Sequence, residues 1–217
     1  MLAYHPRRGE EERRRPIERR EGVSSGRTTR VAAWSAAALA VGVAVSRGRG
    51  RRIDGAVFRA LNVDRGPVID AALSGITELG SIWASIGAAA ALGAVGERRA
   101  AVRGLAAAST AWIAGQALKR RFRRDRPYVA DVGGTRLLIR EPNGTSWPSS
   151  HPAVLLAFAT AAGRELRLGA AARAALAGLA GAVGLSRVHL GVHYPGDVAG
   201  GLLLGRAIGD AWSRERP

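Results

Sequence analysis

Cysteine is absent from this sequence, and acidic residues are few. Without cysteine the chain can form neither disulfide bonds nor thiolate metal sites. Its 17 Asp and Glu residues stand against 33 Lys and Arg, so the formal net charge is +16, although 47% of its 217 residues are hydrophobic. A chain of this length suits one domain. Lysine is almost absent as well: Lys119 is the single one, either because that position requires an ammonium group or because codon usage favours arginine by chance.

The positive charges are gathered in blocks that separate uncharged runs rich in Ala, Gly and Leu. The main blocks are residues 13–15, 49–52, 98–99 and 119–126. A nucleic-acid-binding domain would instead mix its arginines with polar and aromatic residues, so we expect no nucleic-acid partner. Basic blocks beside apolar runs are typical of membrane proteins, whose loops contact anionic lipid headgroups.

Six largely uncharged runs predict the helices of a membrane-embedded bundle. Several are shorter than the ~20 residues that a straight span needs, but they are rich in Ala and Gly, and small residues let helices pack closely in lipid. A soluble Ala-rich bundle is the alternative, and the lack of a continuous polar face argues against it. We therefore predict an all-α, six-helix transmembrane bundle with helices at residues 31–46, 79–96, 100–118, 148–163, 168–186 and 198–212.

The segments outside these runs complete the predicted organisation. Residues 1–30 are dominated by Arg and Glu and predict a disordered, basic cytoplasmic tail, which leaves residues 31–217 as the membrane domain. Residues 53–76 predict an amphipathic segment at the membrane surface. A cytoplasmic amino terminus places residues 98–99 inside, as the positive-inside tendency favours, but it places residues 119–126 outside, against that tendency.

The first candidate site segment runs from Lys119 to Pro127. Lys119 and Arg126 are seven residues apart, so on a helix they would share one face, and Pro127 would end that helix. Two cations beside a membrane helix can bind an anion, although an ordinary basic flank is the alternative interpretation. The other arginines of the segment predict headgroup or diphosphate contacts or a solvated flank; they are Arg120, Arg121, Arg123 and Arg124.

The second segment is Trp147-Pro148-Ser149-Ser150-His151. Proline favours the first turn of a helix, which would place Ser149, Ser150 and His151 where backbone N–H groups have no helical partner. Such a turn can hold a phosphate. A purely structural histidine is the alternative for His151.

The third segment lies between Arg187 and Asp197. Pro195 can open the last helix, which leaves His193 just before it and Asp197 in its first turn. Asp197 can accept the Nδ1 proton of His193 and leave Nε2 free to attack, or it can simply cap the helix. His189, four residues before His193, could belong to a two-histidine metal pair, but we favour a packing or site-lining role.

The three segments lie on the same side of the membrane if all six runs cross it. No run separates Arg126 from Pro148 and none separates Arg187 from Asp197, while two runs lie between His151 and Arg187. Cations, histidines and a carboxylate would therefore meet at one membrane boundary, where such groups usually mark a functional site.

Together these segments resemble the type 2 phosphatidic acid phosphatase (PAP2) superfamily, which includes bacterial polyprenyl-diphosphate phosphatases and the vanadium haloperoxidases. The pattern is Lys-x6-Arg-Pro, then Pro-Ser-x-His, then Ser-Arg-x5-His-x3-Asp, and it spans residues 119–197 with a matching six-helix plan around it. The family usually has glycine where this chain has Ser150. A serine keeps the backbone N–H but adds bulk and a hydroxyl beside the phosphate.

The resemblance implies a role for each matching residue. His193 would be the nucleophile that becomes phosphorylated, and Asp197 would orient it. His151 would protonate the leaving oxygen and then activate water. Such chemistry needs neither a metal nor another cofactor. The phosphate would be bound by Lys119, Arg126, Arg187, Ser149 and the amide of Ser150.

The resemblance also implies an integral-membrane phosphohydrolase. The expected substrate is a lipid-linked phosphate: a prenyl (di)phosphate, a prenyl-linked sugar phosphate, phosphatidic acid or phosphatidylglycerol phosphate. We expect a multi-pass protein of the cell membrane whose site faces the extracytoplasmic side, and we leave its oligomeric state open. Two alternatives remain, namely a phosphotransferase that uses the same histidine and a non-catalytic membrane protein that binds anionic lipids.

Overall fold

The computed structural model of this protein describes residues 8–213, with side chains from residue 26 onward. This part of the chain is helical and contains no strand, which confirms the predicted all-α class. Its elements are α1 (Arg8–Ser46), α2 (Gly48–Leu61), α3 (Pro67–Thr77), the 3₁₀ turn η1 (Glu78–Gly80), α4 (Ile82–Ala94), α5 (Arg98–Phe122), α6 (Pro127–Ala130), α7 (Ser150–Glu165), α8 (Ala170–His189) and α9 (Pro195–Trp212).

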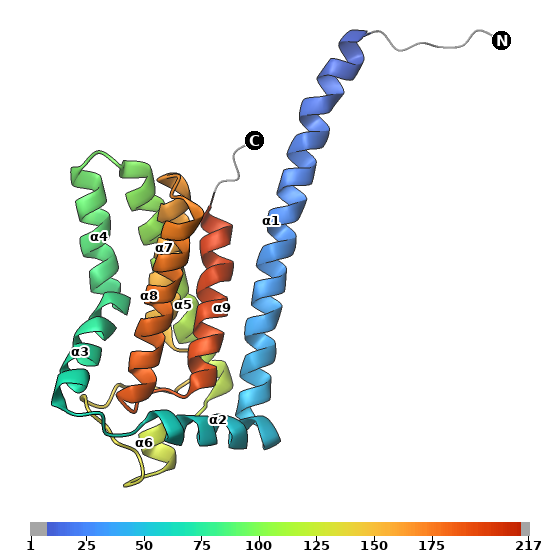
Figure 1. Ribbon diagram of the computed structural model, residues 1–217. Helices are drawn as coiled ribbons and strands as arrows, with labels where there is room; N and C mark the ends of the chain where they lie inside the picture. Colours follow the sequence, from blue (N-terminus) through green and yellow to red (C-terminus); the bar gives the residue numbers. More distant parts are fainter. Residues whose placement is uncertain (1–7, 214–217) are drawn as a thin grey trace.

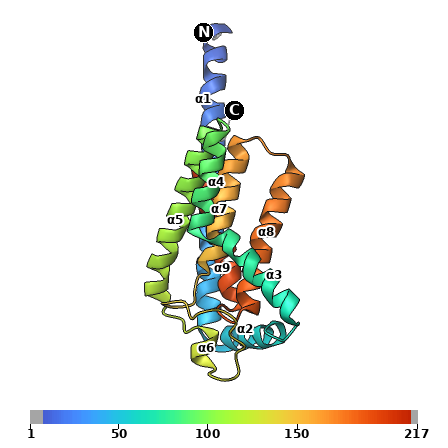
Figure 2. The ribbon, with the colours of Figure 1, turned by 90° about the vertical axis from the view of Figure 1, so that its left-hand side faces the viewer.

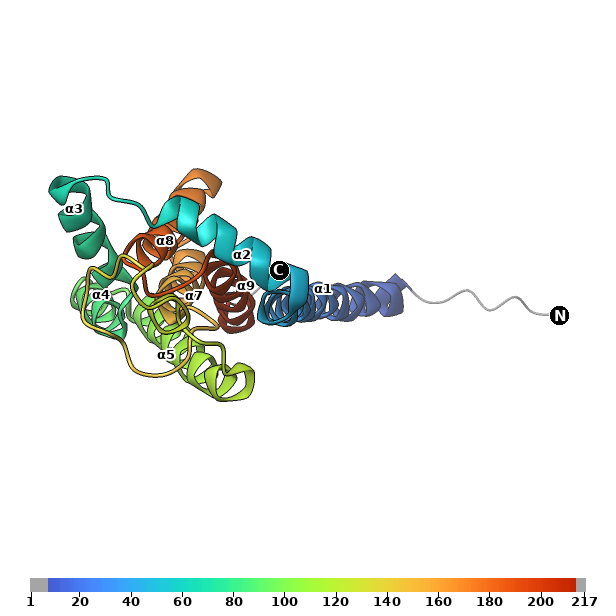
Figure 3. The same ribbon diagram turned by 90° about the horizontal axis from the view of Figure 1, so that it is seen from below.

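The helices α1, α4, α5, α7, α8 and α9 run alongside one another and correspond to the six predicted runs (Figures 1 and 2). α7 contacts α4, α5, α8 and α9, whereas α1 lies at the edge and packs chiefly on α9 (Figure 3). α2 lies across one end of the bundle, and α6 is found at the same end (Figure 1). The stretch predicted as one amphipathic segment, residues 53–76, is divided between α2 and α3.

Small residues bring α9 against α7. Gly201 and Gly205 are four residues apart on α9, and a Cβ on either would clash with a backbone carbonyl oxygen at the start of α7, that of Ser149 or that of Ala153. Because glycine avoids this clash, the two helices can approach closely enough for van der Waals contact to hold them together in lipid. Alanines continue this close packing in the buried core where α5 meets α7.

By length and composition, one helical segment of the described chain can cross a membrane alone. It is Gly26–Ser46 of α1, with a mean hydropathy of 1.4. Pro67–Gly80 and Ile82–Ala94 would make a second if this pair, bent by 63°, were counted as one span. The other helices are shorter or carry charges, such as Arg103 in α5 and Arg206 in α9, so six separate spans stay a prediction.

α1 extends farther toward the amino terminus than its hydrophobic run predicts. It includes residues 8–30, which the sequence assigns to a disordered tail. Arg and Glu are good helix formers, and opposite charges three or four residues apart stabilise a helix, so an apolar helix can continue into this polar stretch. Residues 1–7 of the predicted tail lie outside the described residues, and a domain boundary at residue 30 stays a prediction.

Candidate active site

A cavity of about 260 Å³ lies at the end of the bundle where α2 and α6 are found (Figure 1). It brings together segments that are far apart in the sequence. Two of the predicted site residues, Ser149 and Asp197, are buried beside its lining. The other six line it directly: Lys119, Arg126, Ser150, His151, Arg187 and His193.

Lys119 reaches the cavity from the last turn of α5. This helix ends at Phe122, where Arg123 takes a left-handed conformation with a φ of 46°. Lys119 Nζ donates a hydrogen bond of 3.0 Å to the Thr145 carbonyl oxygen, and Thr145 Oγ1 donates one of 2.8 Å to the Lys119 carbonyl oxygen. These two bonds fix the following loop to the helix end and hold the ammonium group at the cavity.

Arg126 does not share a helix with Lys119, so the predicted helix continuing to Pro127 is wrong. The left-handed turn after Phe122 ends α5, and Arg126 lies just before the short α6. Backbone carbonyl oxygens hold its guanidinium group: Nη1 donates to Val192 over 3.0 Å, and Nε donates to a loop carbonyl over 2.9 Å. The two cations therefore meet through the path of the loop and not through helical periodicity.

His193 is buried, and contacts with its ring determine where its proton lies. Nε2 is 3.3 Å from Arg126 Nη1. A guanidinium group can only donate, so Nε2 is the acceptor and the neutral ring carries its proton on Nδ1. Burial lowers the pKa of His193 well below its usual value, and the positive charges of Lys119, Arg126 and Arg187 lower this pKa further. The imidazole is therefore neutral, with its Nε2 lone pair turned toward the cations.

Asp197 lies next to His193 without a hydrogen bond to it. Its Oδ2 is 3.5 Å from His193 Nδ1, which has no hydrogen-bond partner among the described residues. The same oxygen accepts hydrogen bonds from the backbone N–H of Tyr194, over 2.8 Å, and from Ser146 Oγ. As predicted, Asp197 lies in the first turn of the helix that Pro195 opens. It thus caps α9 and also lies close enough to attract a positive charge on the imidazole.

Arg124 is the site residue that the sequence did not distinguish. Its guanidinium group is buried and bridges two carboxylates, with Nη1 bonded to Asp197 Oδ1 and Nη2 to Asp54 Oδ2, each over 2.7 Å. It also lies over the Tyr194 ring, 4.1 Å from the ring centre. Burial and these partners separate it from the exposed arginines of the same run, which are Arg120, Arg121 and Arg123.

Asp54 and Ser146 complete the support around Asp197. Asp54 Oδ1 accepts a hydrogen bond of 2.8 Å from the Gly196 N–H, so it ties α2 to the start of α9. A signal for Asp54 exists in the sequence, because it is the single acidic residue of the arginine-rich α2. Ser146 offers no such signal, since a serine in a polar loop is common.

The Pro148 segment begins its helix later than predicted. α7 starts at Ser150, with Ser149 as its N-cap residue in an extended conformation and Pro152 in the first turn. The Ser149 N–H donates to the Asp197 carbonyl oxygen over 2.9 Å, so it is already used. The hydroxyls of Ser149 and Ser150 are buried, and neither has a hydrogen-bond partner within residues 26–213. The Ser150 hydroxyl is therefore available to a phosphate in the cavity.

Gly115 of α5 accommodates the bulk that Ser150 adds. A Cβ at position 115 would come within 3.1 Å of Ser150 Oγ, closer than ordinary van der Waals contact. The serine that departs from the usual family glycine therefore lies opposite a glycine on the facing helix.

His151 and Arg187 face the cavity from α7 and α8. Arg187 Nη1 donates to Thr77 Oγ1 over 3.1 Å, whereas its buried Nε has no partner in the described part of the chain. His189 does not line the cavity, and its Nε2 lies 2.8 Å from Asp70 Oδ1, which supports the packing role. Among the described side chains, no group of three or more His, Cys, Asp or Glu is placed to hold a metal ion.

Two tryptophans border the cavity while remaining exposed. Trp83 of α4 and Trp112 of α5 both line it, and their exposed fractions are 77% and 45%. Tryptophan is enriched where a membrane meets water, because its ring is apolar and its N–H is polar. The cavity thus opens beside apolar surface.

Comparison with protein families identifies the class of this protein. A family model of the PAP2 superfamily matches residues 100–214, more than half of the chain, and the chain belongs to this superfamily. The predicted resemblance is therefore confirmed, and the protein is an enzyme that hydrolyses phosphate esters.

Two curated relatives share part of the sequence. The decaprenylphosphoryl-5-phosphoribose phosphatase of Mycolicibacterium smegmatis is 35% identical over 130 residues, which are 60% of this chain and 68% of the relative. The putative undecaprenyl-diphosphatase YbjG of Escherichia coli is 39% identical over 84 residues, which are 39% of this chain and 40% of the relative.

Two solved structures share the fold. The PAP2 type phosphatidylglycerolphosphate phosphatase from Bacillus subtilis has a TM-score of 0.72 at 24% identity, and the match covers 84% of this chain and 94% of that one. LpxE from Aquifex aeolicus has a TM-score of 0.63 at 26% identity, with 72% of this chain and 92% of that one covered. The all-helical bundle is thus that of the PAP2-type membrane phosphatases.

Proposed function

We propose that this enzyme removes phosphate from a lipid-linked phosphate through a phosphohistidine intermediate on His193. The observation that carries the proposal is a neutral, buried histidine that shares one cavity with three cations, Lys119, Arg126 and Arg187. A bound phosphate needs positive charge, and a nucleophile needs an available lone pair. The cavity offers both.

In the first step, the Nε2 lone pair of His193 attacks phosphorus while the bond to the leaving oxygen breaks. The three cations stabilise the charge on the non-bridging oxygens. The ring keeps its Nδ1 proton and becomes positively charged, and Asp197, at 3.5 Å, stabilises that charge. His151, which takes up a proton when the anionic phosphate binds, gives that proton to the leaving oxygen, so the lipid product departs as a neutral alcohol or as a monophosphate.

In the second step, water attacks phosphorus and the bond between phosphorus and Nε2 breaks. His151 has lost its proton and now accepts one from the water. Inorganic phosphate leaves, and both histidines return to their starting protonation states.

A lipid substrate accounts for the surroundings of the cavity. Trp83 and Trp112 provide exposed apolar surface at its border, against which a hydrocarbon tail can lie while the phosphate enters. Within the expected class, the M. smegmatis relative, by its name, acts on a decaprenyl-linked sugar phosphate. This supports a prenyl-linked phosphate over phosphatidic acid or phosphatidylglycerol phosphate. We further propose that the protein crosses the cell membrane several times and that the site faces the extracytoplasmic side.

Rapid quenching in alkaline detergent, after the purified enzyme is mixed with a radiolabelled short-chain lipid phosphate, tests the intermediate. We expect label on His193, stable in base and labile in acid, together with steady release of phosphate. His193→Ala should abolish both signals. The matched control is His189→Gln, which changes a histidine outside the cavity and should retain most of the activity. Phosphate release at the parent rate from the His193→Ala protein would overturn the proposed nucleophile.

The same assay separates the two alternative functions. A phosphotransferase would give the phosphohistidine but would yield phosphorylated alcohol when an acceptor alcohol is supplied. A lipid-binding protein without activity would give neither label nor phosphate.

A further inference from the structure

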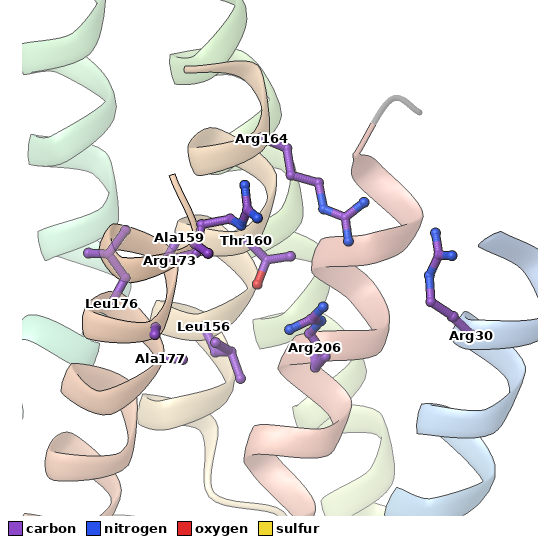
Figure 4. A pocket seen from close by; sticks show the side chains of 11 residues that line it. Arg30, Leu156, Ala159, Thr160, Arg164, Arg173, Leu176, Ala177 and Arg206 are labelled. Carbon is purple, nitrogen blue, oxygen red and sulfur yellow. The ribbon is translucent and has the colours of Figure 1, made fainter. Parts of the chain in front are cut away.

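A second cavity lies between α1, α7, α8 and α9, at the end of the bundle away from the active site (Figures 1 and 4). Its volume is about 590 Å³. Each of the four helices contributes one guanidinium group to its lining. We call it the arginine pocket, after Arg30, Arg164, Arg173 and Arg206.

One carboxylate pairs with two of the three arginines that α7, α8 and α9 contribute to the pocket. Asp210 is fully buried and accepts hydrogen bonds from Arg164 over 2.7 Å and from Arg206 over 3.1 Å. The residues that line the pocket include no Asp or Glu. The other three arginines repel Arg164. Among the described residues, the three arginines of α7, α8 and α9 therefore exceed the one carboxylate beside them, and a bound anion would offset the excess charge.

The lining of the pocket combines apolar side chains with arginines, and its α8 side carries Arg173 as well as apolar residues. Leu176 and Ala177 lie on the α8 side, whereas Arg30 and Arg206 lie on the α1 and α9 side (Figure 4). The hydroxyl of Thr160 points toward the space between them (Figure 4). A matching ligand combines an anion with hydrocarbon. That is the chemistry of a phospholipid where its phosphate joins the acyl chains.

Two tryptophans place the arginine pocket at the depth of lipid headgroups. Trp34 follows Arg30 by one turn of α1, and the Arg206 guanidinium lies 6.0 Å from the centre of its ring. Trp212 ends α9 at the same end of the bundle. Both rings are partly exposed, at 36% and 39%, as expected at a membrane–water interface.

We propose that the arginine pocket binds the phosphate group of an anionic phospholipid in the leaflet opposite the active site. Guanidinium groups bind phosphate oxygens through paired, charge-assisted hydrogen bonds. The pocket lacks a histidine among its lining residues, so its lipid is a bound component and not a substrate.

Thermal unfolding of the full-length protein in phosphatidylcholine nanodiscs tests this proposal. Phosphatidylglycerol is titrated into the bilayer, and inorganic phosphate is titrated in a parallel series without it. The test variants are Arg173→Gln, whose side chain is exposed and bonds to a backbone carbonyl, and Arg206→Gln. The matched control is Arg167→Gln, an exposed position between α7 and α8 that does not line the pocket.

We expect phosphatidylglycerol to raise the unfolding temperature of the parent and of Arg167→Gln equally. For Arg173→Gln and Arg206→Gln, about tenfold more phosphatidylglycerol should be needed for the same rise. Any lipid binding at the active site is the same in the variants and in the control, so it does not contribute to the difference between them. Equal responses of all four proteins would overturn the proposal. A different result would be that inorganic phosphate stabilises the parent as much as the lipid does and that this effect is lost in Arg173→Gln. That result would assign the pocket to free phosphate and overturn the proposal of a lipid ligand.

Discussion

Arginines surround a cavity at each end of the helical bundle, but the carboxylates at the two ends pair with different kinds of arginine. In the arginine pocket, Asp210 pairs directly with two of the lining arginines, Arg164 and Arg206. At the active site, Asp197 pairs with Arg124, which does not line the cavity. Within the described chain, the cations that we propose to bind phosphate have no carboxylate partner; these are Lys119, Arg126 and Arg187.

This difference explains how a site can hold a buried acid and still attract an anion. A dedicated arginine neutralises Asp197 and also fixes its position beside His193. The lining cations instead bond to neutral carbonyl and hydroxyl oxygens, which orient them without cancelling their charge. The arginine pocket has the cations but lacks the histidines, so we assign it binding without chemistry.

After His193→Ala, removal of His151 should have the largest effect, because the proposed general acid–base residue lies at one end of the bundle alone. For His151→Ala we expect phosphate release to fall by about 10²–10⁴-fold, since both the leaving oxygen and the attacking water lose their proton partner. Rapid-quench measurement of both steps checks this. A turnover rate equal to that of the parent would contradict the assigned role.

Arg124→Gln should have the next largest effect. Removing one partner of a buried ion pair leaves unpaired carboxylates, so we expect a loss of about 3 kcal/mol in unfolding free energy, together with a large fall in kcat. Arg123→Gln, an exposed neighbour with the same charge change, is the control and should stay within about twofold of the parent. Equal effects of the two substitutions would contradict the view that Arg124 is a dedicated partner of Asp197 whereas Arg123 belongs to a basic flank.

Lys119→Arg tests whether the single lysine is required. The forked guanidinium cannot reproduce a compact ammonium donor at the Thr145 carbonyl oxygen, so we expect kcat/KM to fall by roughly tenfold while the fold is retained. Steady-state kinetics on a short-chain lipid phosphate measure this change. Unchanged kinetics would favour the interpretation that lysine stands there by chance.

Trp112→Ala tests how much the lipid tail, as distinct from the phosphate, contributes to substrate recognition. Loss of apolar surface at the border of the cavity should reduce kcat/KM several-fold for a long-chain prenyl phosphate and leave a short-chain phosphate nearly unaffected, because roughly 1–3 kcal/mol of hydrophobic contact is at stake. Parallel kinetics with the two substrates give the ratio. Equal losses on both would argue that Trp112 supports the fold rather than the tail.

The smallest effect is expected from Arg173→Gln on catalysis. The arginine pocket lies at the opposite end of the bundle, and changes at distant sites without shared partners act independently. With a soluble short-chain substrate, kcat should therefore stay within about twofold of the parent. A strong loss of kcat would show that the two ends are linked and would break the comparison between them.

The three motifs were predictable because each depends on short spacing. The arrangement of His193, Pro195 and Asp197 at a helix start follows from proline geometry and from the preference for an acid in the first helical turn. α9 has this arrangement. The shared helical face of Lys119 and Arg126 was not correct, because a left-handed turn at Arg123 intervenes. Helical spacing does not predict a left-handed turn at a position that has neither glycine nor proline.

The sequence by itself determined the all-α bundle, the family and the kinds of side chain that gather at the site, because hydrophobic runs and motif spacing are local properties. Only the tertiary structure decided which arginine neutralises Asp197 and which helix supplies Asp54 to complete the bridge. Arginines in one run differ in burial and in partners, and both depend on the packing of α2, α9 and the loop after α5 around them. The sequence shows which residues are charged, but the fold determines which opposite charges they pair with.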